Sequence, residues 1–144
     1  MIVKITVGEK MLDALRATTS FKTVDFYSGQ TDRTLQMPLP AALVVYNSST
    51  FEYEANSTRG LKAMGLCEFS VLIVGKTLKG YDAVLPSVLS LLEIAQEALN
   101  GLIVGQGNTH IRITGESMMQ VTPNGEFIYG QVYQYTDRVT GGLR

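Results

Sequence analysis

Two apolar runs constrain the fold of this chain more than any other feature. Residues 41–46, AALVVY, contain no charged side chain, and residues 66–74, LCEFSVLIV, are interrupted only by Glu68 and Ser70. Runs this continuous are typical of strands that are covered on both faces, whereas half-exposed strands alternate between apolar and polar residues. We therefore predict two inner strands over these residues, and we expect the second to be central in its sheet.

A broad apolar face predicts a long helix over residues 81–100, which Asp82 can cap. Its apolar residues recur at helical spacing. They are Leu85, Val88, Leu89, Leu92, Ala95 and Leu99. A shorter helix is expected over residues 7–17, because Thr6 and Glu9 fit a capping box in front of it.

Three further strands are expected, over residues 21–27, 110–116 and 126–137. The sequence Pro-Asn-Gly at 123–125 is a turn signal, so the last two strands should form an antiparallel hairpin. This order of elements is typical of an α+β fold. We predict a single domain over residues 1–144, with a mixed or antiparallel sheet of about four to five strands packed against one long and one short helix.

The connection between the two inner strands, residues 47–65, is predicted to be an extended arm or hairpin. Phe51 and Tyr53 alternate there with Glu52 and Glu54, which is the period of an exposed strand. The alternation places both aromatic side chains on one face. Phe51 and Tyr53 are therefore candidates for contact with another subunit or a partner.

The triplet Gly75-Lys76-Thr77 resembles the end of a phosphate-binding loop. Such a loop also needs a glycine five residues before Gly75, because a glycine there lets the backbone N–H groups turn toward the phosphates. Residue 70 is a serine in this chain. Residues 70–74 read as strand, which leaves no room for the loop. We predict no nucleotide site here and interpret Lys76 and Lys79 as turn residues that contact water or a neighbouring subunit.

The remaining candidates for chemistry are isolated. His110 is the only histidine and has no local pattern that supplies a partner for acid–base catalysis. The glycine loop at 101–108 follows a helix, so it is not a dinucleotide fingerprint. Cys67 is the only cysteine and is expected to be buried and inert. We expect no catalytic, cofactor or metal site. A small enzyme or ligand-binding domain that uses Lys76, His110 or the glycine loop remains an alternative.

The composition argues against several classes of partner. The net charge is −1 and only 17% of residues are charged, so there is no basic footprint for nucleic acid or anionic lipid. The sequence shows no signal-peptide pattern and no apolar run of the roughly 20 residues that span a membrane. We expect no direct nucleic-acid partner and no membrane partner. The low charge, with 7 Tyr and 6 Met, fits either a neutral surface or subunit interfaces that are depleted of charge.

An aromatic row on the last strand has two interpretations. The row consists of Phe127, Tyr129, Tyr133 and Tyr135. It could pack beneath the main helix as core, or it could face a partner, where tyrosine supplies both contact area and a hydroxyl. Ile128 and Val132 offer a competing apolar face on the same strand. In the second interpretation Tyr129, Tyr133 and Tyr135 are interface residues.

The order of elements resembles a known family. The stretches that carry the similarity are PAALVVY at 40–46, FSVLIV at 69–74, GYD at 80–82, ALNG at 98–101 and YQY at 133–135. They resemble the tail terminator (tail completion) proteins of tailed phages, as in Mu-like prophages and related contractile tail particles. The similarity covers residues 38–138 and an N-terminal helix in the expected place.

That resemblance implies a structural protein without catalysis or cofactors. It implies a homohexameric ring on the end of the tail tube, which stops tube growth and joins the tube to the head or neck. The implied partners are other copies of the chain, the tail tube protein, a neck or connector protein and the sheath. The implied location is the host cytoplasm during assembly and the virion or tail-like particle thereafter. A head–tail connector or another neck or baseplate adaptor is the alternative.

Overall fold

The computed structural model describes residues 2–28, 37–53, 61–77, 84–105, 108–123 and 125–141. Within these residues, two helices and five strands follow one another. They are α1 (Lys4–Ala17), β1 (Thr23–Phe26), β2 (Ala41–Tyr53), β3 (Leu61–Lys76), α2 (Val84–Leu99), β4 (Arg112–Val121) and β5 (Glu126–Gly141). This is the predicted α+β fold.

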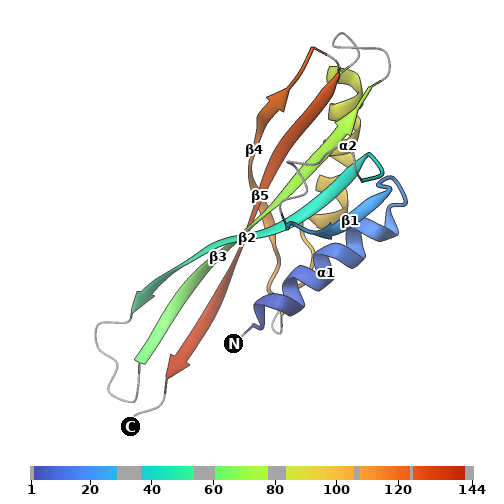
Figure 1. Ribbon diagram of the computed structural model, residues 1–144. Helices are drawn as coiled ribbons and strands as arrows, with labels where there is room; N and C mark the ends of the chain where they lie inside the picture. The colour runs from blue at the N-terminus through green and yellow to red at the C-terminus, as the bar shows by residue number, and fades with distance from the viewer. Residues whose placement is uncertain are drawn as a thin grey trace.

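The strands form one mixed sheet in the order β1-β2-β3-β5-β4. β1 runs parallel to β2, and every other neighbouring pair is antiparallel. The prediction that residues 66–74 form a central strand is confirmed, since β3 lies in the middle of the sheet. Both helices pack on one face of the sheet and contact each other (Figure 1).

Cores on both faces of the sheet explain the continuous apolar runs. The larger core lies between the helices and the sheet, where Met11 and Leu15 of α1 and Val88 of α2 are fully buried with β3 residues such as Ile73. A smaller core lies on the opposite face. It consists of Ala41, Leu43, Leu72, Val74 and Ile128, with Met37, Leu39 and Val45 packed against it. The inner strands therefore present apolar side chains in both directions.

The predicted start of the first helix is wrong. α1 begins at Lys4, and the residue before it, Val3, makes no side-chain capping bond. The capping box predicted from Thr6 and Glu9 would have placed the first residue of the helix at Val7, about one turn later. Val7 is fully buried within the helix, which indicates that packing against the core sets the start of α1 in place of a capping bond.

The main helix is confirmed over Val84–Leu99, and the residues at 78–83, including Asp82 and Lys79, lie outside the described part of the chain. Its buried stripe is narrower than predicted, because Leu85 and Leu89 are exposed. The helix ends as expected before Gly101, whose positive φ of 88° favours glycine.

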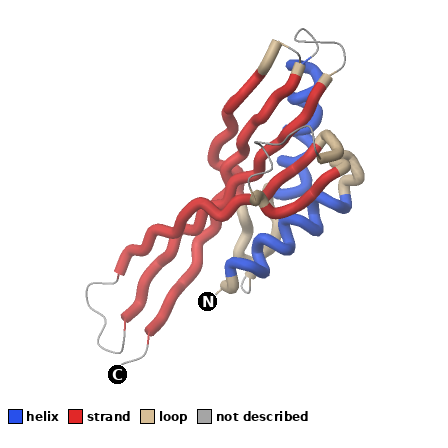
Figure 2. Tube along the Cα trace, in the orientation of Figure 1, coloured by secondary structure: helices blue, strands red, loops and turns tan. Residues whose placement is uncertain are grey.

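Three strands run on past the helices to form an arm. We call residues 47–53 of β2, 61–67 of β3 and 135–141 of β5 the arm, and the rest of the molecule the body. The β2 and β3 segments pair with each other, and β5 pairs on the other side of β3. The arm projects away from both helices, and no second layer of secondary structure covers it in the described part of the chain (Figures 1 and 2).

A buried hydrogen-bond network attaches α2 to the sheet. Gln131 of β5 is fully buried, and its Nε2 donates to the Leu92 carbonyl oxygen (2.9 Å) and to Glu116 Oε1 (2.8 Å). The Tyr133 hydroxyl donates to Gln131 Oε1 (2.8 Å). Burial raises the pKa of Tyr133 above its ordinary value, and the negative charge of Glu116 raises it further. The folded protein therefore holds Tyr133 in its neutral form.

Tyr133→Phe tests this network through the pH dependence of stability. The unfolded chain releases the tyrosine proton above a pH of about 10, whereas the folded chain keeps it, so this stabilisation is complete below that pH and is lost as the pH rises further. At neutral pH the variant should be about 1–3 kcal/mol less stable, because it leaves Gln131 Oε1 without its donor. Above pH 10 its free energy of unfolding should fall less steeply than that of the wild type.

Denaturant unfolding between pH 7 and 11 measures both effects. Tyr129→Phe is the matched control, because Tyr129 lies on the same strand and is only partly buried. If Tyr133→Phe and the wild type lose stability with the same slope above pH 10, the raised pKa does not contribute to stability.

Gly75 is explained by packing. We expected the strand to end at Val74, before Gly75. It continues to Lys76 instead, and Gly75 pairs with Phe127 on β5. A Cβ at Gly75 would collide with the Phe127 ring, which lies directly over the backbone there. The glycine at position 75 is therefore explained by its close contact with Phe127, and a phosphate-binding role is not needed to account for it.

Gly75→Ala should destabilise the protein by about 1–3 kcal/mol, because the core around Phe127 has no room for the methyl group. Gly115→Ala on β4 is the control, since a Cβ there meets no atom within 4 Å of the described structure. Thermal or denaturant unfolding of the two variants checks the difference. Equal stabilities would show that the Phe127 ring moves away without cost.

Candidate interaction surface

The structure separates the candidate interface residues into two groups. Phe51 and Tyr53 lie on the arm with exposed fractions of 41% and 66%. Tyr133 and Tyr135 are buried in the core beneath the helices, and Tyr129 is partly buried against the same core. The aromatic row faces the helices, so Tyr133 and Tyr135 do not form an exposed surface of the chain.

Lys76 lies at the opposite end of β3 from the arm. Its Nζ is 3.8 Å from Glu126 Oε1 on the paired strand, and both side chains are partly exposed. The structure therefore does not bring Lys76 together with Phe51 or Tyr53. Lys79 lies outside the described residues.

The arm exposes apolar side chains on both of its faces. Phe51 lies against β3, where its ring atom Cε1 is 2.9 Å from the position that a Cβ of Gly65 would take. Tyr53 points to the same face two residues on. On the opposite face, Met64 and Leu66 are exposed by 41% and 36%. These exposed apolar groups make the arm a candidate surface for contact with another protein.

A polar cluster at the root of the arm ties its three strands together. The β2 register shifts between Tyr46 and Ser48, and the Asn47 amide there donates to Glu68 Oε2 (3.0 Å) and to Ser70 Oγ (2.6 Å). From the other side, Gln134 Nε2 donates to Glu68 Oε1 (3.1 Å). One carboxylate thus accepts hydrogen bonds from β2 and β5 across the central strand β3, which fixes the direction in which the arm leaves the body.

Aromatic and sulfur groups fill the helix-facing side of the same root. The Tyr46 and Ser49 hydroxyls hydrogen-bond each other (2.5 Å), and Ser49 Oγ donates to the buried Cys67 Sγ (3.3 Å). The Phe69 ring packs edge-on against Tyr46 and stacks with Tyr135. Burial raises the pKa of Tyr135, and its interaction with Cys67 raises that pKa further. Cys67 is buried, as expected.

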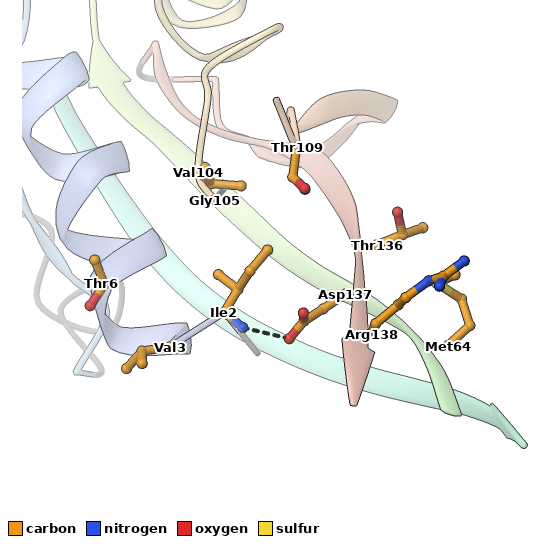
Figure 3. Close-up of a pocket in the computed structure, with 10 residues that line it drawn as sticks. All are labelled: Ile2, Val3, Thr6, Met64, Val104, Gly105, Thr109, Thr136, Asp137 and Arg138. Carbon is orange, nitrogen blue, oxygen red and sulfur yellow. Dashed lines mark hydrogen bonds between the residues drawn. The ribbon is translucent and has the colours of Figure 1, made fainter. Parts of the chain in front are cut away.

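An open cleft of about 850 Å³ lies beside the root, between the start of α1, the segment after α2, and β5 (Figure 3). The Ile2 backbone N–H donates to Asp137 Oδ2 (2.9 Å), which ties the N-terminal segment to the arm. The other lining residues are Val3, Thr6, Met64, Val104, Gly105, Thr109, Thr136 and Arg138. This cleft contains a carboxylate but neither the lone histidine nor the lone cysteine.

The described residues bring together no arrangement typical of a reactive site. His110 is exposed, and its Nδ1 hydrogen-bonds a backbone carbonyl oxygen, that of Gly101 (2.9 Å), instead of a carboxylate. Across the described ranges, no three His, Cys, Asp or Glu residues lie close enough to hold a metal ion. None of the described helices is long and apolar enough to cross a membrane.

The last strand is longer than its sequence pattern predicted, and its extension forms the third strand of the arm. We ended the last strand at Asp137, whereas β5 continues to Gly141 and pairs with β3 along its whole length. The signal was present, since Thr136, Val139 and Thr140 are β-branched residues that favour strands. The contact between Ile2 and Asp137 had no signal in the sequence.

Comparison with known proteins shows a similarity of fold. No protein-family model and no curated protein matches the chain. Among solved structures, a chain of the virion of a native gene transfer agent (GTA) particle is similar, with a TM-score of 0.55 and 14% sequence identity. The similarity covers 93% of this chain and 92% of that chain, so it includes the body and the arm together.

Glu68→Ala tests the polar cluster at the root of the arm. Removing the shared acceptor should lower the local stability of the arm by about 1 kcal/mol. The amides of residues 47–53 and 135–139 should then exchange with deuterium about fivefold faster, while the amides of α1 keep their wild-type rates. Glu52→Gln is the control on the same arm, because Glu52 is exposed. If both variants exchange at the same rate, Glu68 does not hold the arm.

Proposed function

We propose that this protein is a structural component of a phage-like virion or tail particle, where it forms a ring that ends the tail tube and joins it to the head or neck. The observation that carries the proposal is the arm, which exposes Phe51, Tyr53, Met64 and Leu66 without a second layer to cover them. The similarity of the whole fold to a chain of a virion particle supports the same class of function.

The arm suits assembly better than it suits catalysis. A three-stranded sheet without a covering layer leaves apolar side chains and strand edges in water, and proteins usually protect such edges. In a ring, neighbouring copies can cover both. The charged fraction of 17% is consistent with a chain whose surface is largely buried by other subunits.

The mechanism we propose is steric. A ring that docks on the last ring of tail tube protein covers the surface to which the next tube subunits would add. Its far side presents a different surface, which a neck or connector protein, and the sheath in a contractile tail, can bind. This needs shape and surface chemistry but no reacting group. By the resemblance, we propose a homohexamer that assembles in the host cytoplasm and remains in the particle.

The same features are compatible with a neighbouring position in the particle. A head–tail connector or a neck or baseplate adaptor also needs a ring and two different docking faces, because a fold does not fix a function. A small enzyme or ligand-binding domain has less support, since Lys76 and His110 lie on separate elements and each is engaged by another group.

Particles assembled without this protein distinguish the positions. For a tail terminator, electron micrographs should show tubes of uncontrolled length that carry no heads. For a connector, tubes should keep their normal length and only fail to join heads. Complementation by a Lys76→Ala/His110→Ala variant is the control against the ligand-binding alternative, and it should restore particles fully. Normal particles in the absence of the protein would refute every structural role.

A further inference from the structure

Apart from the outer edge of β1 and the edge of β5 in the arm, two long strand edges of the sheet have no partner strand within the described residues. β1 covers the outer edge of β2 only along Ala41–Val44, so residues 45–53 of β2 are uncovered. β4 is the last strand on the other side of the sheet. The Ile113 N–H on its outer edge donates to Asn100 Oδ1 (3.0 Å), and from Thr114 to Val121 no strand covers this edge within the described residues. Each edge carries backbone N–H and C=O groups that can pair with a strand of another chain.

We propose that the uncovered edge of β2 in one copy of this chain pairs with the outer edge of β4 in the next copy. This deepens the proposed ring and rests on it, since it names the surface that joins the subunits. The two edges are of similar length, at about 30 Å for β2 and about 26 Å for β4 with a rise of about 3.3 Å per residue. The antiparallel register that we propose places Phe51 opposite Met118, so that residues 48–53 of β2 pair with residues 116–121 of β4 over about 20 Å.

The direction of the strands favours this pairing. Each of the steps from β2 to β3, β5 and β4 is antiparallel, so β2 and β4 run in opposite directions. When a neighbouring copy extends the sheet in the same orientation, its β2 therefore runs antiparallel to β4 of the first copy. An antiparallel ladder is the more stable kind. The uncovered edge of β5 in the arm would meet β2 in parallel instead.

The two edges are different surfaces, so the contact is head-to-tail. After one contact forms, each copy at the end still offers a free β2 edge or a free β4 edge. Such contacts repeat and close into a ring when the rotation between copies allows it. The β2 edge lies in the arm and the β4 edge in the body, so neighbours are staggered along their strands, as strands are in a closed barrel.

Side-chain chemistry on the two edges is complementary. Phe51 and Tyr53 are exposed on β2, and Met118, on the same face of the sheet, is exposed by 60% on β4. Thioether sulfur packs favourably against aromatic rings. Edges that resist pairing usually carry lysine or proline, and neither residue occurs in 45–53 or 115–121. Both edges are therefore suited to pairing.

The pair Phe51→Cys and Met118→Cys tests the contact. Within one chain the two positions are far apart, because Phe51 is level with Asp137 on β5 whereas Met118 is level with Tyr129, about 26 Å along the strand. A disulfide within the chain is excluded at that distance. Under mild oxidation the double variant should give a ladder of covalent oligomers that ends at the ring size, and each single variant should give dimers at most.

Two controls make the outcome decisive. Phe51→Cys combined with Leu85→Cys pairs the arm with an exposed residue of α2 outside the proposed contact, and it should give no ladder. Negative-stain images of the unoxidised variants show separately whether rings form. Rings without a ladder in the Phe51/Met118 pair would refute this contact and leave the proposed function intact. A protein that stays monomeric, both alone and with tube ends, would refute the contact and the proposed function. An equal ladder in the Phe51/Leu85 control pair would refute the contact alone.

Discussion

The pairing of β3 with β5 is the interaction on which the rest of the structure depends. Every residue of β3 has a partner on β5, from Leu61 opposite Gly141 to Lys76 opposite Glu126. One half of this ladder is covered by helices and by the smaller core, while the other half forms the middle of the arm. The same continuous backbone hydrogen bonding thus anchors an exposed element in a buried one. No layer covers the arm within the described residues, so this ladder is what joins it to the packed body.

Polar clusters fix the geometry on each side of that ladder. In the body, Gln131 joins α2 to the sheet and is fully buried, so any rearrangement of the helix would leave its amide unpaired. At the root of the arm, Glu68 accepts hydrogen bonds from Asn47 and Gln134 on the two flanking strands. Apolar packing alone would permit several orientations of helix and arm, whereas directional bonds select one. A pre-set arm also loses less conformational entropy on binding.

The sequence predicted the elements better than it predicted which of their faces are exposed. The continuous runs identified the inner strands, and the alternation around Phe51 and Tyr53 indicated an exposed strand. Leu85 and Leu89 were assigned to the buried stripe of α2 because periodicity gives the direction of a stripe but not its covered width, which depends on the neighbouring elements. Tyr133 and Tyr135 remained ambiguous for a related reason. Two apolar faces on β5 both pack in the body, and only the tertiary arrangement shows that the helices cover the aromatic one.

Only part of the candidate surface could be predicted from the sequence. Its β2 side could be recognised from local alternation, but the β5 strand and the edges of the sheet depend on strand order, which no local pattern encodes. This matters for function, because a backbone edge recognises another chain with little regard to side chains. Proteins that assemble through such edges can diverge widely in sequence while they keep the same contacts. The fold similarity over 93% of the chain at 14% identity shows that this fold is compatible with very different sequences.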